Sequence, residues 1–147
     1  MRQPLAAKLA RRGEEVDVMS QLIEFNAEAK IIRVTVVGEL KDEGAEELYR
    51  SVHRFVAERE VRGGILDLSP VTSLTVSPET LRRLSKNPPL FPPEIVRVIV
   101  APGDLIFGMA RLFQISRSEV HSNLHVVHTL EEAYKVHGLQ SPQFEIV

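Results

Sequence analysis

Hydroxyl and carboxylate side chains gather at the end of an apolar run, in the stretch ILDLSPVTSLTVSP that begins at residue 65. Asp67 and Ser69 lie near its start, and Thr75 and Ser77 lie near its end. A hydroxyl group can accept a phosphate, and polar groups at the carboxyl end of a parallel strand can bind a ligand. We therefore take these four residues as the candidate site of a strand-end loop.

Each of these residues also has a simpler structural role. Ser77 precedes a Pro-Glu pair, a pattern typical of a helix start at which serine caps free backbone N–H groups. Asp67 and Ser69 can bond to the local backbone and turn the chain. We expect Ser77 to act as a helix cap, with phosphate on Ser77 or Thr75 as the less favoured alternative. For Asp67 and Ser69, a ligand site and a turn both remain open.

Other combinations that would support catalysis or metal binding are weak. His121, His125 and His128 lie close in sequence, but zinc needs three or four converging ligands, and His125 and His128 face opposite sides of one straight strand. Ser69, Asp104 and a histidine supply the residue types of a hydrolase triad, yet nothing resembles a nucleophile elbow. No glycine-rich phosphate loop is present. We expect no enzyme activity, no metal site and no cofactor.

Length and composition indicate one ordinary domain. The 147 residues are 44% hydrophobic, enough for a core that needs neither disulfides nor metal. A net charge of -2 and a pI near 6.2 disfavour a nucleic-acid binder. Cysteine is absent, no apolar run is long enough to span a bilayer, and no secretory signal is evident. We expect a cytoplasmic protein without a transmembrane segment.

Strand and helix patterns alternate along the chain and must position the candidate site. Strands are predicted over 21–28, 30–40, 65–68, 94–102 and 123–128, and helices over 42–60, 77–86, 105–117 and 129–138. Gly38 marks a change of direction, 69–76 is a polar loop, and 87–94 is an extended connector. The order β-β-α-β-α-β-α-β-α predicts an α/β fold with a mixed, mostly parallel sheet of five strands and four helices.

We expect the domain to span residues 20–139. The first twelve residues carry four basic side chains and no acid, and residues 1–19 are expected to form a mobile tail and joining segment, with a basic arm for an anionic surface as the lesser alternative. Residues 140–147 form a second tail, which either packs back through Phe144 and Ile146 or frays.

The predicted helix over 105–117 is apolar on nearly every side, whereas a surface helix needs only one apolar stripe. One stripe contains Ile106, Met109, Ala110 and Phe113; another contains Leu105, Leu112 and Ile115; Phe107 adds to the apolar surface. One stripe can face the sheet, and the other must meet the chain itself, a second subunit, a protein partner or an apolar ligand. Gly108 costs about 1 kcal/mol relative to alanine in a helix, which indicates close packing against it.

Two further apolar residues, Leu90 and Phe91, lie in the proline-rich stretch PPLFPP. They either form a docking point on a stiff connector or cover the edge of their own core. We keep both with the helix as candidates for an interface or an apolar ligand site.

The order of elements, with ILDLSPVTSL after the third strand, resembles the STAS domain, also called the SpoIIAA-like fold. That family includes anti-sigma factor antagonists and cytoplasmic domains of sulfate transporters. The resemblance covers about residues 20–139. The stretch APGDLIFGMARLFQ (101–114) resembles a group of small bacterial SpoIIAA-like proteins, which are sometimes grouped with CRAL-TRIO lipid-transfer domains as well.

The loop departs from the antagonist pattern where that family carries its switch. The typical loop reads Asp-Leu-Ser-Gly-Val, two residues, then Ile-Asp-Ser-Ser-Gly, and the first serine of the last group is the phosphoacceptor. The residues that match are Asp67, Leu68, Ser69, Val71 and Ser77, with Leu74 in place of the isoleucine. Thr75, Val76 and Pro78 depart from it, and Val76 occupies the phosphoacceptor position. The resemblance thus implies that the usual switch is missing.

The resemblance and the surplus apolar helix together favour a non-enzymatic regulatory or protein-interaction module. We expect a homodimer that also binds a protein partner, which the sequence does not identify. The alternative is a carrier of a small apolar or lipid-like molecule, which rests on the same helix and on analogy of fold.

Overall fold

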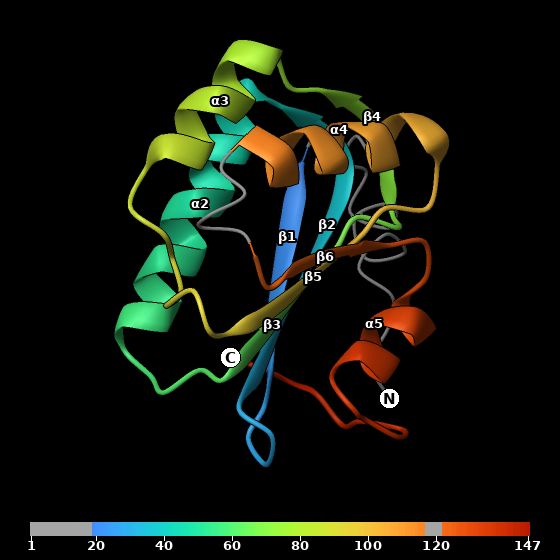
Figure 1. The fold of residues 1–147 in the computed structure, drawn as a ribbon. Helices are drawn as coiled ribbons and strands as arrows, with labels where there is room; N and C mark the ends of the chain where they lie inside the picture. The colour runs from blue at the N-terminus through green and yellow to red at the C-terminus, as the bar shows by residue number, and fades with distance from the viewer. Residues whose placement is uncertain (1–18, 117–121) are drawn as a thin grey trace, which may run out of the picture.

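The computed structural model describes residues 19–116 and 122–147. The elements in chain order are β1 (Ser20–Asn26), β2 (Ile31–Lys41), α2 (Asp42–Ala57), β3 (Gly63–Asp67), β4 (Val71–Thr75), α3 (Pro78–Lys86), β5 (Val96–Val100), α4 (Asp104–Ser116), β6 (Leu124–Val127), α5 (Leu130–Val136) and β7 (Glu145–Ile146). Helices α2, α3 and α4 gather on one side of the strands, and α5 lies on the other (Figure 1).

The strands form one mixed sheet in the order β6-β5-β3-β2-β1-β7, and β4 pairs with β2 away from this path. Strand β1 is antiparallel to both of its neighbours, whereas the other pairs are parallel. The predicted mixed α/β fold is confirmed, with seven strands in place of five. In the part of the chain that the structure describes, no helix has the length and apolar character needed to cross a membrane.

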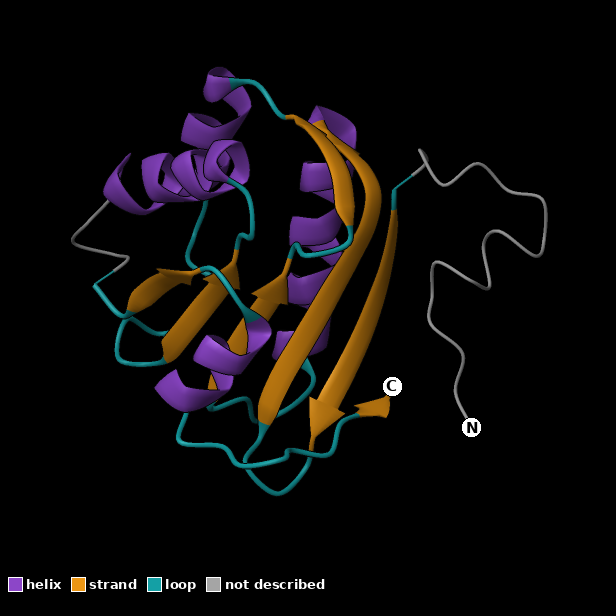
Figure 2. Cartoon of the chain, turned by 90° about the vertical axis from the view of Figure 1, so that its right-hand side faces the viewer, coloured by secondary structure: helices purple, strands orange, loops and turns teal. Residues whose placement is uncertain are grey.

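Strand β4 lies in the stretch predicted as a polar loop, and β2 explains why. Eleven residues long, β2 pairs with β3 only from Ile31 to Thr35, and the rest of the strand would be left with an open edge. The register shifts between Gly38 and Glu39, and Gly38 has a φ of 96°, which favours glycine. After this bulge β2 pairs with β4. In Figure 2 the two long strands of the hairpin curve past the shorter central strands.

The sheet buries side chains on both faces. Ile32, Val34 and Val36 of β2 alternate as predicted and pack against the side that α2, α3 and α4 cover. Ile31 and Ile65 belong to the opposite core, under α5. Burial on both faces is typical of parallel strands flanked by helices.

Local signals set the helix ends. The Ser77 side chain accepts a hydrogen bond from the Thr80 backbone N–H, so its predicted role as a cap is confirmed. Thr129 and Glu132 form the predicted capping box, and Gly138 ends α5 with a φ of 69°. Phe144 is buried in the core beneath α5, and the strand that follows it pairs with β1.

Candidate functional site

The four candidate residues of the loop separate into two pairs, one at each end of β4. Asp67 pairs in register with Thr35 of β2, whereas Thr75 pairs with Lys41. Six residues of strand span about 20 Å, so the two pairs cannot hold one small ligand together. At one end, a hydrogen bond joins Asp67 to Ser69. At the other end, Thr75 is the last residue of β4 and Ser77 follows two residues later.

Asp67 and Ser69 form a closed local turn. The Asp67 Oδ1 atom accepts hydrogen bonds from the Ser69 backbone N–H at 2.9 Å and from Ser69 Oγ at 2.5 Å. Asp67 is buried, and the next backbone N–H, of Leu68, donates to the Val100 carbonyl. This geometry favours turn chemistry, because the carboxylate already accepts two donors from its own loop.

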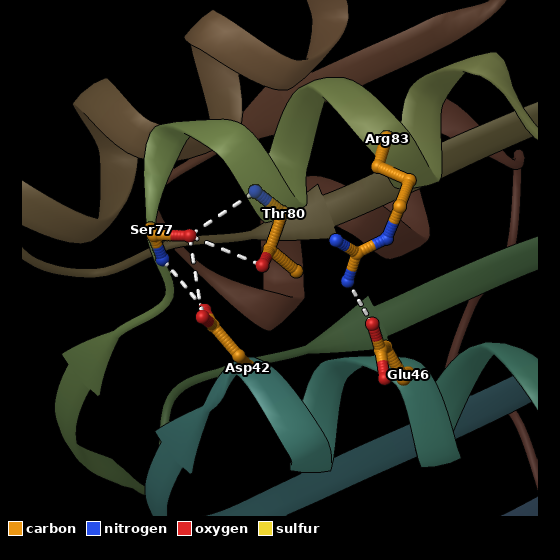
Figure 3. Close-up of polar contacts among 5 residues, drawn as sticks. All are labelled: Asp42, Glu46, Ser77, Thr80 and Arg83. Carbon is orange, nitrogen blue, oxygen red and sulfur yellow. Dashed lines mark hydrogen bonds and ion pairs between the residues drawn. The ribbon is translucent and has the colours of Figure 1, made fainter.

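Ser77 lies at the centre of a polar cluster that joins two helix starts (Figure 3). Its backbone N–H donates to Asp42 Oδ1 at 2.7 Å, and its Oγ lies 3.2 Å from Asp42 Oδ2 and 3.1 Å from Thr80 Oγ1. One turn along the same helices, Arg83 and Glu46 form an ion pair. The cluster therefore ties the first turns of α2 and α3 together.

Asp42 and Thr80 belong to this cluster, and the sequence predicted neither as a site residue. The hydrogen bond from the Ser77 backbone N–H holds the pKa of the Asp42 carboxyl below its ordinary value. A phosphate on Ser77 would bring about two negative charges next to this carboxylate. The only available signal was the position of Asp42 in the first turn of a helix, which does not reveal a partner 35 residues away.

An apolar cavity of about 240 Å³ lies between the sheet and the layer of α2, α3 and α4. Its lining includes Val34, Leu48, Leu81, Leu84, Ala110 and Phe113. Protein interiors leave few voids larger than a water molecule. This cavity is partly open to the surface, so it is an apolar cleft and not a sealed packing void.

The comparisons with known proteins concern the fold. The sequence matches no protein-family model and no curated protein. Among solved structures, an anti-sigma factor antagonist from Mycobacterium paratuberculosis superposes with a TM-score of 0.61 at 20% identity, covering 85% of this chain and 98% of that one. The anti-sigma factor antagonist SpoIIAA in its unphosphorylated form gives a TM-score of 0.50 at 11% identity, covering 83% and 100%.

The fold is STAS-like. The predicted resemblance in architecture is therefore confirmed, although β4 and β7 were not in the predicted order of elements. At these identities the likeness describes the fold alone, so the site must be judged on the residues of this chain.

Val76, which the loop resemblance aligns with the antagonist phosphoacceptor, lies in the core. Val76 is 4% exposed and lines the cavity. The residue after it, Ser77, is half-buried and occupied as a cap.

Helix α4 has the two apolar stripes predicted from the sequence. Ala110 is buried, and Ile106, Met109 and Phe113 are half-buried on the side that faces the core. Leu105, Leu112 and Ile115 form the outer stripe, with exposed fractions of 69%, 42% and 61%. Phe107, the additional apolar residue, is half-buried and stacks on the His128 ring with 4.2 Å between centroids.

The prediction of close packing at Gly108 is wrong for the part of the chain that the structure describes. A Cβ atom built on Gly108 meets no described atom within 4 Å. The glycine is exposed on α4, so nothing described here requires the absence of a side chain.

The connector residues cover the core. Phe91 is 8% exposed, and Leu90 is half-buried against the same core. The Phe91 ring lies 3.4 Å from the position that a Gly64 Cβ would occupy, so the missing side chain at Gly64 leaves it room. Of the two alternatives left open by the sequence, the structure supports the second.

The histidines that the structure describes do not come together with other metal-ligating side chains. His125 and His128 are both exposed, His121 lies outside the described residues, and among residues 19–116 and 122–147 no three histidine, cysteine or acidic side chains converge. His137 is the unexpected one, since its Nε2 lies 3.0 Å from the Gly64 carbonyl oxygen. Burial lowers the pKa of His137, and the proximity of His125 lowers it further.

Proposed function

We propose that residues 20–139 form a non-enzymatic regulatory module that acts in the cytoplasm by binding proteins, and that lacks the phosphoserine switch. The observation that carries the proposal is the outer stripe of α4 in a STAS-like fold. Leu105, Leu112 and Ile115 are large apolar side chains on one helix, and such exposed groups are typical of interaction surfaces. Two solved proteins of this fold are anti-sigma factor antagonists, whose name describes an action on another protein.

The first partner proposed for this stripe is a second copy of the chain. Helix α4 packs beside α3, so its outer stripe is free to meet the same stripe of a partner subunit across a twofold axis. Replacing Leu112 and Ile115 by lysine places charge at the centre of this interface. Sedimentation velocity should then show a dimer for the native chain and a monomer for the double variant.

The control is Val136→Lys, which adds one lysine at an exposed apolar residue of α5. This variant should remain dimeric. A native chain that stays monomeric over the whole concentration range would refute the homodimer, and a dimer that survives both α4 substitutions would place the interface elsewhere.

A different protein partner is tested by photo-crosslinking. A crosslinking amino acid at position 112 should capture the same defined protein in repeated experiments, whereas the same group at position 136 should not. Capture of equal sets of proteins from both positions would contradict a specific interaction through α4.

The cavity favours a second candidate function, in which the chain carries a small apolar molecule as cargo. Native mass spectrometry of the freshly purified protein distinguishes the two. Added mass of a few hundred daltons on a single chain supports a carrier, and two chains without added mass support the interaction module.

A further inference from the structure

We propose that the cavity beneath α3 and α4 is a regulatory binding site for a small, uncharged, apolar molecule. The volume of about 240 Å³ exceeds that of an engineered cavity of about 150 Å³ that binds benzene, so it has room for a molecule of about ten carbon atoms, such as a fused pair of aromatic rings. Most of its lining is hydrocarbon, from leucine, isoleucine, valine and phenylalanine side chains.

The polar side chains of the lining are largely occupied within the chain, which is why we infer an uncharged ligand. There are four of them: Tyr49, Ser85, Asn87 and Arg97. Tyr49 donates to the Pro88 carbonyl at 2.5 Å, Ser85 Oγ donates to the Arg82 carbonyl at 2.8 Å, and Arg97 Nε donates to the Ile95 carbonyl at 3.2 Å. A charged ligand would lose its hydration without finding a free set of partners.

The hydrogen bond between Tyr49 and Pro88 forms a wall of the cavity. Tyr49, Asn87 and Pro88 line the cavity from one side and also line a shallow outer groove along α2 with Arg50, His53 and Arg54. The two hollows therefore meet at this bond, which joins α2 to the connector after α3. Movement of the connector at Pro88 would open the cavity to the groove.

The cavity also touches the elements that carry the proposed interface. Its lining includes Val76, which precedes α3, and two leucines of α3, Leu81 and Leu84. Helix α4 contributes Met109, Ala110 and Phe113. A ligand there would fix the positions of both helices relative to the sheet. An apolar ligand beside Val76 would then regulate this chain in the way that a phosphate on the loop regulates an antagonist. This regulatory role rests on the proposed function.

The test uses the full chain and fluoronaphthalene as the probe, with fluorine NMR to follow binding and amide hydrogen exchange to follow the helices. We expect saturable binding of the probe. The bound probe should also slow amide hydrogen exchange in α3 and α4 more than in α5. Naphthoate, which adds a carboxylate to the same ring system, should bind about tenfold more weakly or worse. Neither readout requires a dimer, so a monomeric chain would contradict the proposed function and leave this inference testable.

Two variants with a control locate the site. Ala110→Leu adds three carbons to a buried lining residue, and Leu84→Phe fills the cavity from α3 and serves if the first variant does not fold. Either should weaken fluoronaphthalene binding about tenfold. The control Arg111→Leu places the same side chain at the next, exposed position of α4 and should bind as the native chain does.

A third variant tests the wall. Tyr49→Phe removes the bond to Pro88 and should speed exchange of the probe between bound and free states while changing its affinity by less than about threefold. No saturable binding to the native chain, tighter binding of naphthoate than of fluoronaphthalene, or equal binding by Ala110→Leu, Leu84→Phe and the native chain would each overturn the site. Binding without slower exchange in α3 and α4 would overturn its regulatory role.

Discussion

The two sides of the sheet carry glycines in opposite surroundings. A Cβ built on Gly63, on the α5 side, lies 2.8 Å from Cε1 of the His137 ring and 3.2 Å from Ile31 Cγ1. On α4, across the sheet, a Cβ built on Gly108 meets nothing within 4 Å. The α5 side is closely packed here, whereas the α4 side combines a partly open cavity with an exposed apolar stripe.

The polar contacts differ between the sides in the same way. Under α5, Arg33 pairs with buried Glu24 at 2.7 Å, bonds to the Tyr134 hydroxyl and lies 4.2 Å over the Phe144 ring. Between α2 and α3, the cluster around Ser77 lies at the surface of the helix layer. The α5 side thus has a small, closely packed core around an ion pair, whereas the other side has the larger apolar core together with a cavity and an exposed stripe.

The largest expected effect comes from breaking the buried pair under α5. Arg33→Met removes the cation and leaves Glu24 buried, so the free energy of unfolding should fall by about 3 kcal/mol in urea titrations. The control Arg62→Met removes an exposed ion pair with Glu60 and should cost no more than about 0.5 kcal/mol. Equal losses in the two variants would contradict the special role of the α5 side.

The glycines themselves provide the next test. Gly63→Ala should lower the free energy of unfolding by about 2 kcal/mol, because the new methyl group forces the His137 ring to shift. Gly108→Ala should raise it by up to about 1 kcal/mol, because alanine favours the helix and the space is open. Thermal and urea unfolding measure both, and a tolerated alanine at Gly63 would show that this side packs more loosely than the structure indicates.

The cluster between α2 and α3 should give a smaller effect. Ser77→Ala removes the cap and should cost about 1 kcal/mol of unfolding free energy. Ser77→Asp would be tolerated at an ordinary helix start, but here its carboxylate would face Asp42 and should also destabilise the fold. Adding Asp42→Asn should restore stability to the aspartate variant. If Ser77→Asp alone were as stable as the native chain, the objection to phosphate on Ser77 would fall.

The smallest expected effect is the pH dependence from His137. Its pKa is lowered from 6.5 in the folded chain, so the unfolded chain takes up a proton first as the pH falls through 6.5. The contribution of His137 to the free energy of unfolding is therefore fully present above pH 6.5, and it is lost as the pH falls toward the lowered pKa. Urea titrations of His137→Gln should show a flatter stability profile over this range. His53 is exposed, so His53→Gln should leave the pH dependence of the unfolding free energy as it is in the native chain. If His53→Gln flattened this pH dependence equally, His137 would be excluded as its cause.

Features that depend on neighbours in sequence were predictable. The Ser77 cap, the box of Thr129 and Glu132, and the stop at Gly138 each involve contacts within a few residues. The two stripes of α4 follow from helical periodicity. These signals act through the local backbone, so no knowledge of the rest of the fold was required.

Features that depend on distant partners were missed or left open. Strand β4 exists because β2 extends past β3, a difference in length that becomes visible only when the strands are paired. Phe91 packs against Gly64, 27 residues earlier in the chain, and Asp42 bonds to a serine 35 residues away. Periodicity reports which face of an element is apolar, but it does not report what that face meets.

The sequence by itself determined most of the alternation of strands and helices, though not β4 or β7, together with the helix caps and the surplus of apolar residues on α4. Tertiary structure alone decided that Asp67 and Ser77 lie at opposite ends of β4, that α4 leaves its outer stripe exposed, and that a cavity remains beneath α3 and α4. The physical reason is range. Hydrogen bonds of caps and turns form between neighbours in sequence, whereas space, burial and exposure depend on how whole layers pack.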